Sequence, residues 1–213
     1  MVNAFRKMTI LVATLTIGGF SATSIHAADE ARQDPDASAV TYKEFVEGDP
    51  NAKVTVVEYA SLTCSHCANF YTTGYPELKK QYIDTGKIRF VFRDFPTAPQ
   101  QLATAAAMVA RCAPAGRGKT IIGLIFKNQG EFFKNPNDAM RGYAQLAGMT
   151  SEDVDACLKN KSVFDEIERV ATTAVNVYKV RATPTFFVND QIVEGEVWET
   201  LKDTIDAALA DAD

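Results

Sequence analysis

Two cysteines that bracket a serine and a histidine follow directly after an apolar, β-branched segment of this sequence. The segment Val56-Val57-Glu58-Tyr59-Ala60 runs through Ser61-Leu62-Thr63 into Cys64-Ser65-His66-Cys67. A strand that passes at once into a helix places both thiols at the start of that helix. Three uses compete for such a pair: two ligands of a zinc ion, a structural disulfide, or a reversible redox couple.

The start of a helix changes the chemistry of the first thiol. Unpaired backbone N–H groups and the positive end of the helix dipole lie there, and both favour a thiolate over a thiol. His66 adds a hydrogen-bond donor close by. We therefore expect Cys64 to be the exposed nucleophile and Cys67, one turn into the helix, to be the buried resolving thiol. A disulfide whose reduced form is stabilised in this way tends to be oxidising.

The zinc and the purely structural interpretations of this pair are weaker. A structural zinc ion normally has a second ligand pair with comparable local spacing. Cys112 and Cys157 each stand alone in the sequence, and His26 falls where a signal peptide would be removed. We therefore prefer redox chemistry for Cys64 and Cys67 and keep the other two uses as alternatives.

The first residues of the chain differ in composition from the rest. Two basic residues precede the mostly apolar residues 8–20, and small and polar residues follow. The apolar part is shorter than the ~18–20 residues that cross a bilayer comfortably. We predict a secretory signal peptide over residues 1–27, cleaved after Ala27 or Ala28, and a flexible leader over residues 28–41. An uncleaved anchor is the alternative, and with either one the folded part is exported to an oxidising compartment, where disulfides are permitted.

Length and charge narrow the function further. The chain has 213 residues, of which 46% are hydrophobic and 23% are charged, which suits one globular domain. The formal net charge is −5, and no run of Lys and Arg could follow a phosphate backbone. We therefore expect no nucleic acid among the partners of this protein.

Hydrophobic periodicity predicts a parallel crossover around the cysteines. Residues 53–59 and 87–93 have strand composition, and in the second segment apolar and polar residues alternate with a period of two. Residues 67–82 between them have helical composition, which a glycine and Pro76 should kink or break. Residues 42–50, before the first strand, resemble a short helical turn that ends in a turn signal.

A helical insertion follows, and then a second group of strands. We predict the insertion over residues 97–178, with helices at 101–112, 120–127, 138–146 and 151–159, the last with a capping box from Thr150 to Asp153. One face of a further helix carries apolar residues at Val163, Ile167, Val170, Ala174 and Val177. Strands at 185–188 and 191–193, joined through Asn189-Asp190, and a last helix at 197–210 that buries Trp198, Leu201, Ile205 and Leu209 complete the chain. This order predicts an α/β fold whose sheet is formed by residues 42–96 and 179–213.

Three features together resemble the DsbA-like branch of the thioredoxin superfamily, in particular its alphaproteobacterial type. They are Cys64-Ser-His-Cys67 after a strand that reads Val-Thr-Val-Val-Glu-Tyr, the helical insertion, and Thr183-Pro184-Thr185-Phe-Phe-Val late in the chain. The resemblance extends from about Tyr42 to Leu209. It implies a thioredoxin fold, which is a central mixed β-sheet flanked by helices, with an inserted helical subdomain.

The resemblance also implies roles for single residues. Pro184 is expected to form a cis-proline loop that faces the active-site sulfurs, and Thr183 before it offers its backbone to a substrate peptide; a trans turn is the alternative. Glu58, six residues before Cys64, matches a buried acid that exchanges a proton with Cys67, and a solvated strand-edge glutamate is the alternative.

The remaining cysteines match a second, structural disulfide of this branch. Closing the loop of about 45 residues between Cys112 and Cys157 is worth roughly 3–4 kcal/mol in the chain-entropy model. Two free buried thiols are the alternative.

Two departures bear on the direction of the reaction. Ser65-His66 stands where the best-known oxidases have Pro-His, and Thr183 stands where they have valine. Both positions influence the redox potential, so they leave open whether the protein works as an oxidase or as an isomerase.

The resulting hypothesis is a periplasmic thiol:disulfide oxidoreductase. It donates the Cys64–Cys67 disulfide to newly exported proteins with free cysteines through a mixed disulfide at Cys64, and a DsbB-type membrane oxidase linked to quinones reoxidises it. We expect a monomer without cofactor or metal. The alternatives are an isomerase or reductase, against which the short leader counts because isomerases of this superfamily use a separate N-terminal dimerisation domain, and a non-catalytic chaperone or binding module. A metal carrier that uses Cys64, His66 and Cys67 is a variant of the last.

Overall fold

Five strands form one mixed sheet in the computed structural model, which describes residues 42–195 and 198–212. The predicted signal peptide and leader lie outside these residues. The strands are β1 (Phe45–Gly48), β2 (Val54–Ala60), β3 (Ile88–Asp94), β4 (Thr185–Val188) and β5 (Gln191–Glu194). Their order in the sheet is β1-β3-β2-β4-β5, in which β2 and β3 run parallel and every other neighbouring pair runs antiparallel.

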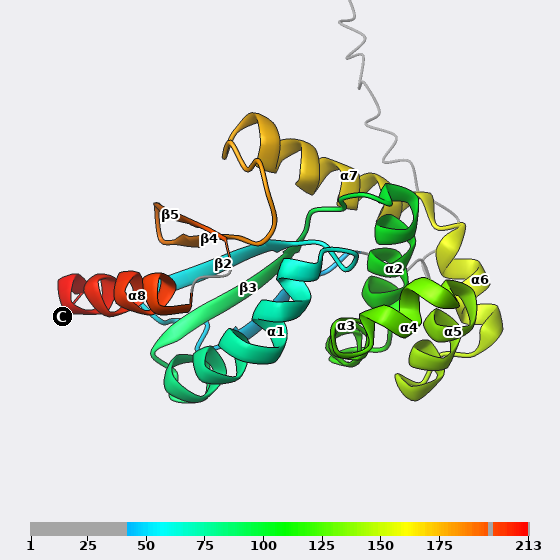
Figure 1. Cartoon of the computed structure of the whole chain (residues 1–213), viewed down its shortest axis with the longest axis horizontal. Coiled ribbons are helices and arrows are strands. Elements are labelled where there is room, and N and C mark those ends of the chain that lie inside the picture. The colour runs from blue at the N-terminus through cyan, green and yellow to red at the C-terminus, as the bar shows by residue number, and fades with distance from the viewer. Residues whose placement is uncertain (1–41, 196–197, 213) are drawn as a thin grey trace, which may run out of the picture. The chain divides into compact units, whose positions relative to one another are not determined.

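The central strand β2 is apolar because helices cover the sheet on both faces (Figure 1). Val54 and Val56 are fully buried, and Val56 pairs with Phe90 of β3. Helix α1 (Ser65–Leu78) makes the crossover from β2 to β3, which confirms the predicted parallel unit. Helix α8 (Trp198–Ala212) packs against β2, β4 and α1.

Of the kink or break expected at Pro76, the break is wrong. Helix α1 continues through Pro76 to Leu78, and a π-helical segment, η1 (Lys79–Ile83), follows it. Gly74 is required by packing, because a Cβ atom there would lie 2.6 Å from the ring of Phe70. A proline close to the end of a helix removes only one hydrogen bond, and the wider η1 turn takes up the distortion.

The helical turn expected over residues 42–50 is also wrong, since the edge strand β1 lies there and pairs antiparallel with β3. The sequence of β1 lacks the alternation of apolar and polar residues that is typical of a strand, because one of its inward positions carries a charge. Phe45 and Glu47 both point inward, and Glu47 accepts a hydrogen bond from the hydroxyl of Tyr75 at 2.7 Å. An inward carboxylate with a hydrogen-bond donor is tolerated at an edge strand.

Six helices lie between β3 and β4 in the described chain. They are α2 (Gln100–Cys112), α3 (Gly118–Lys127), α4 (Gln129–Lys134), α5 (Pro136–Leu146), α6 (Ser151–Leu158) and α7 (Lys161–Asn176). Helices α2 to α6 gather beside one end of the sheet, and α7 leads back from them towards β4 (Figure 1). The capping box of α6 is confirmed, because Thr150 Oγ1 accepts from the backbone N–H of Asp153 and the Asp153 carboxylate accepts from that of Thr150.

The remaining predicted helices need two adjustments. Helix α7 ends at Asn176, so Val177 leaves the buried face and is 64% exposed. Helix α8 buries Leu201 and Ile205 completely but Trp198 and Leu209 only in part. The hairpin of β4 and β5 through Asn189-Asp190 is confirmed, and Asn189 adopts a positive φ of 50°.

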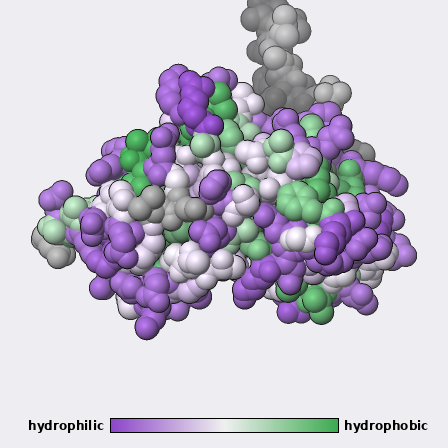
Figure 2. All heavy atoms as spheres, in the orientation of Figure 1, coloured by the Kyte–Doolittle hydropathy of each residue, from purple (hydrophilic) through white to green (hydrophobic). Residues whose placement is uncertain are grey.

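The surface is largely hydrophilic on the face that Figure 2 shows, where the hydrophobic areas are small and separate. No helix among the described residues is long and apolar enough to span a bilayer.

Candidate active site

Cys64 and Cys67 lie at the start of α1, as the sequence predicts. Cys64 is the N-cap residue with extended backbone angles (φ −85°, ψ 124°), and Cys67 occupies the first turn. Both are free thiols; Cys64 is partly exposed, whereas Cys67 has no exposed surface. A thiol partner can therefore approach Cys64 but not Cys67.

Hydrogen bonds lower the pKa of Cys64 to about 5. The largest cause is a hydrogen bond from the thiol of Cys67; burial opposes it, and the side chain of Thr183 and the backbone N–H groups of Cys67 and His66 add to it. Cys64 is accordingly a thiolate at neutral pH. His66 contributes to this arrangement through its backbone, next to the sulfur.

Cys67 has the opposite environment. Burial raises the pKa of its thiol well above the ordinary range, the hydrogen bond to Cys64 raises it further, and the negative charges of Glu58 and Cys64 add to that. Cys67 therefore keeps its proton while Cys64 is ionised. Two thiols on one helical turn differ in this way because one faces solvent and donors, while the other faces the core.

The Thr183–Pro184 peptide bond is cis and lies against the first sulfur. In its thiol form Cys64 can donate to the carbonyl oxygen of Thr183, at 3.2 Å. The hydroxyl of Thr185 donates to the carbonyl oxygen of Ala182 at 2.8 Å and Gly195 N–H donates to that of Pro184 at 3.1 Å, so both ends of the loop are held.

Glu58 is buried beneath the cysteines and is 4% exposed, on the same face of β2 as Val54 and Val56. Burial raises the pKa of its carboxyl group to about 8, and the negative charge of Cys64 contributes to the rise. No cation pairs with it among residues 42–195 and 198–212. A carboxyl group with this pKa can both give and take a proton near neutral pH.

Gln129 and Ser61 support the active-site turn, and neither was predicted from the sequence. The side-chain amide of Gln129 donates to the carbonyl oxygens of Leu62 and Cys64, each at 3.0 Å. Ser61 Oγ accepts from the backbone N–H of Thr97 at 3.1 Å. Gln129 starts α4 and lies 65 residues after Cys64, so no local pattern could have identified it.

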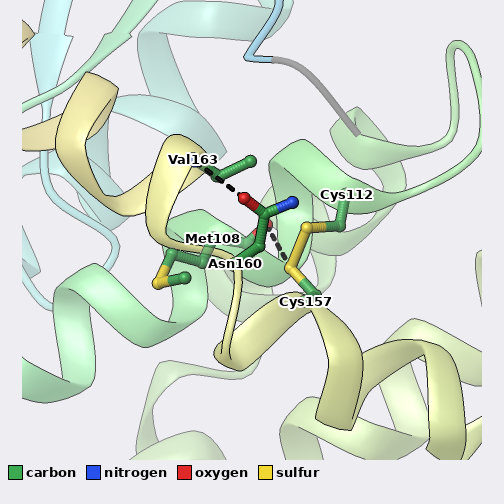
Figure 3. Close-up of a disulfide and its surroundings, with 5 residues drawn as sticks. All are labelled: Met108, Cys112, Cys157, Asn160 and Val163. Carbon is green, nitrogen blue, oxygen red and sulfur yellow. Dashed lines mark hydrogen bonds between the residues drawn. A yellow bond between two sulfur atoms is a disulfide. The ribbon is translucent and has the colours of Figure 1, made fainter. Parts of the chain in front are cut away.

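Cys112 and Cys157 are joined by a disulfide away from these residues, with Cα atoms 6.0 Å apart (Figure 3). The bond links the end of α2 to the end of α6. Cys157 Sγ lies 3.1 Å from the carbonyl oxygen of Met108, and Asn160 beyond it caps α7 by accepting from Val163 N–H at 3.1 Å. Within the part of the chain that the structure describes, no three His, Cys, Asp or Glu side chains are grouped to hold a metal ion.

The chain matches known proteins over most of its length. A thioredoxin family model matches residues 41–207. Candidate protein-disulfide oxidoreductases of Rickettsia bellii and Rickettsia conorii are 31% and 33% identical over 193 and 180 residues; these cover 86% and 81% of this chain, and 74% and 64% of those proteins.

The structural comparison agrees. The crystal structure of Wolbachia pipientis alpha-DsbA1 is 27% identical and superposes with a TM-score of 0.72 over 80% of this chain and 92% of that one. A protein-disulfide isomerase from Novosphingobium aromaticivorans, 23% identical with a TM-score of 0.68, shares the fold. The chain therefore belongs to the DsbA-like protein-disulfide oxidoreductases of the thioredoxin superfamily.

Proposed function

We propose that this oxidoreductase works as a periplasmic oxidase, which donates the Cys64–Cys67 disulfide to newly exported proteins. The observation that carries the proposal is the pKa of Cys64, which hydrogen bonds lower to about 5. Because they stabilise the thiolate, these bonds stabilise the reduced form and make the disulfide a stronger oxidant. The oxidase DsbA owes its oxidising power to a stabilised reduced form, and the same physical reasoning applies to this chain.

The exposure of the two sulfurs supports the order of steps. A substrate thiolate attacks Cys64 Sγ, forms a mixed disulfide there, and breaks the Cys64–Cys67 bond, so that Cys67 leaves as a thiolate and takes up a proton. A second substrate thiolate then attacks the substrate sulfur of the mixed disulfide. The substrate leaves oxidised, and Cys64 leaves as a thiolate, for which a pKa of about 5 makes it a good leaving group.

Glu58 is the proposed proton donor in the first step. Its carboxyl group, with a pKa raised to about 8 by burial, is largely protonated at neutral pH and can protonate the Cys67 thiolate. When a membrane oxidase restores the disulfide, the Glu58 carboxylate takes the proton back. His66 and Thr183 stabilise the Cys64 thiolate both during disulfide donation and during reoxidation.

The loop at Pro184 is the proposed substrate-binding element. In the dithiol form, the thiol of Cys64 can donate to the carbonyl oxygen of Thr183. In the mixed disulfide Cys64 has no proton, so this carbonyl oxygen is available to a backbone N–H group of the substrate. The same holds for the Cys64 thiolate and for the Cys64–Cys67 disulfide, so an extended peptide can bind to this carbonyl oxygen beside Pro184 before and during the mixed disulfide.

Location and partners complete the proposal. Residues 1–27 act as a cleaved signal peptide and residues 28–41 as a leader, while residues 97–178 form a helical subdomain inserted between residues 42–96 and 179–213. The mature protein is a monomer that needs no cofactor, and a DsbB-type membrane oxidase linked to quinones reoxidises it. Fractionation of cells, followed by sequencing of the mature N-terminus, tests export and cleavage; a full-length chain in the cytosol would contradict both.

The decisive experiment is the equilibrium between the Cys64–Cys67 couple and glutathione, on protein without residues 1–27 and with Cys112 and Cys157 intact. We expect a potential of about −120 mV, as for strong oxidants. A potential of about −270 mV would overturn donation and favour a reductase. In parallel, Cys67→Ala should accumulate mixed disulfides with exported proteins, whereas Cys64→Ala should form none; full function in Cys64→Ala would instead point to a chaperone.

A further inference from the structure

A small cavity adjoins Glu58 on the side of the protein where α1 and α3 cover β1 and β3. Its volume is about 30 Å³, which is enough to hold a water molecule. Glu58 lines it and is 4% exposed, and within the described chain no hydrogen-bond donor reaches its carboxyl group. The other lining residues include Glu47, Tyr71, Tyr75 and Lys119. A buried carboxyl group thus faces a space that polar groups from three other elements also line.

Two of these polar groups continue the helical row that begins at Cys67. Tyr71 and Tyr75 follow Cys67 at intervals of four residues, so all three side chains lie along one face of α1. The two rings stack, with centroids 5.0 Å apart and planes inclined by 10°. Burial raises the pKa of both hydroxyl groups, and the negative charges of Glu47 and Glu58 raise it further. Both phenols therefore stay protonated and can relay a proton.

At the far end of this row, Tyr75 contacts Glu47 of β1, which reaches solvent. Tyr75 Oη donates to Glu47 Oε1 at 2.7 Å, and Glu47 Oε2 lies 3.2 Å from Lys119 Nζ and 3.8 Å from Lys79 Nζ. The side chain of Glu47 is 14% exposed, while those of the two lysines are 39% and 41% exposed. Strand β3 adds only apolar side chains to the cavity, Phe90 and Phe92.

We propose that Glu58 exchanges its proton with solvent through this cavity, by way of Tyr75 and Glu47, rather than past Cys64. The inference rests on the proton role of Glu58 in the proposed function. In the outward direction Glu58 protonates a water molecule in the cavity, that water protonates the oxygen of Tyr75, and Tyr75 gives its own proton to the Glu47 carboxylate. One proton leaves Glu58, one arrives at Glu47, and Tyr75 keeps the same number of protons.

The geometry favours this route because its outer half already exists as a hydrogen bond. The Tyr75 hydroxyl points its proton at Glu47, which is the orientation that outward transfer requires. Towards the active-site surface, Glu58 would have to pass its proton by Cys67, which is fully buried, and Cys64, which is bonded to the substrate in the mixed disulfide. Separate routes for proton and substrate also allow Glu58 to be reprotonated while a substrate covers Cys64.

The test compares Tyr75→Phe and Glu47→Gln with a matched control, Tyr82→Phe. Tyr82 also donates to a carboxylate, Asp206 Oδ1 at 2.7 Å, but it lies outside the cavity. The measured quantities are the rate at which dithiothreitol reduces the oxidised protein, in H₂O and D₂O between pH 5 and 9, and the equilibrium potential. We expect both cavity variants to react about tenfold more slowly with an altered solvent isotope effect, and Tyr82→Phe to match the wild type.

The equilibrium potential separates a route from a structural effect and from the proposed function. A relay changes rates alone, so the potentials of Tyr75→Phe and Glu47→Gln should equal that of the wild type. Wild-type rates and isotope effects in both variants, while Glu58→Gln is slow, would overturn the route and leave the role of Glu58 standing. A wild-type rate in Glu58→Gln would instead remove Glu58 from the proposed mechanism, and the route with it.

Discussion

Cys64 and Cys67 stand three positions apart on one helix, whereas Cys112 and Cys157 are 45 residues apart and join two helices. The first pair is reduced in this structure and the second is bonded. Around the first pair, hydrogen-bond donors converge on one sulfur. Around the second, the sulfurs are packed between α2 and α6, and Cys157 is only 4% exposed.

The difference shows how the same type of residue can form either a reactive or a structural disulfide. Breaking the first bond creates a thiolate that the fold stabilises, so reduction is favoured by the native structure. Breaking the second leaves a buried thiol at Cys157 and a partly buried one at Cys112 and frees a long loop, so reduction is opposed by chain entropy. Placement relative to a helix N-terminus, rather than the cysteines themselves, decides whether a disulfide is reactive or structural.

The largest expected effect is that reducing Cys64–Cys67 stabilises the protein. The pKa of Cys64 lies at about 5, below the ordinary value of 9. The stabilising contribution of the thiolate is therefore absent below pH 5, grows as the pH rises, and is complete above pH 9. Four pKa units correspond to at most about 5 kcal/mol, and to less in practice because Cys64 is partly exposed and screened by solvent.

Urea unfolding of the oxidised and reduced forms between pH 5 and 9 measures the gap between their free energies of unfolding. The experiment uses the Cys112→Ala/Cys157→Ala background, so that only the first pair changes its redox state. A gap that stays constant with pH, or that favours the oxidised form, would show that the Cys64 thiolate is not stabilised by the fold.

Replacing the second pair should have the opposite sign and a similar size. Cys112→Ala/Cys157→Ala should lower the free energy of unfolding by roughly 3–4 kcal/mol, because the loop between them is no longer closed in the unfolded chain. The reduction potential of Cys64–Cys67 should not change, because neither residue contacts the active site. A shift of that potential would mean that the two regions are coupled and that the second pair is more than a structural bond.

Local sequence patterns predicted the parts of the fold that local interactions determine. The capping box at Thr150 and Asp153 and the hairpin at Asn189-Asp190 each depend on residues within three positions of one another. Strand β1 was missed because Glu47 occupies an inward position that its hydrogen bond from Tyr75, 28 residues away, and its ion pair with Lys119 make acceptable. Pairing partners far along the chain decide such elements, and periodicity does not contain them.

The active site divides in the same way. The position of Cys64 and Cys67 at a helix start followed from local patterns, whereas Thr183 and Glu58 came from the family resemblance. Gln129 came from neither, since α4 is short and its amide acts on the backbone of a turn 65 residues earlier. Backbone carbonyl groups leave no trace in a sequence, so the residues that bind them are the hardest to predict.

Thr183→Val tests the cause of the low pKa of Cys64, and we expect its effect on the Cys64–Cys67 couple to be of intermediate size. The hydroxyl group of Thr183 helps to lower the pKa of Cys64, so its removal should raise that pKa from about 5 towards 9. A hydrogen bond to a charged group is worth about 1.5–3 kcal/mol, which corresponds to a couple less oxidising by about 30–60 mV. Ultraviolet absorbance of the thiolate and equilibration with glutathione measure the two changes. Thr183→Ser keeps the hydroxyl and should behave as the wild type; if it matches Thr183→Val, altered packing of the loop rather than loss of the hydroxyl is responsible.

The smallest expected effect concerns the contact between the helical region and the first cysteine pair. Gln129→Met keeps the length of the side chain but removes both donations, to Leu62 and Cys64. We expect a loss of about 1–2 kcal/mol in stability, and a rate of reaction with dithiothreitol that is lower by a few-fold because the turn is held less firmly. Gln145→Met, on the exposed side of α5, is the matched control and should change neither.

Combining Gln129→Met with Cys112→Ala/Cys157→Ala tests whether the amide depends on the disulfide. If the disulfide holds only the far helices, the losses in stability should add to within about 0.5 kcal/mol. A much smaller combined loss would mean that the disulfide positions Gln129 and, through it, the turn that carries Cys64. The Cys112–Cys157 disulfide would then help to position the Cys64–Cys67 pair, although it takes no part in the thiol–disulfide exchange.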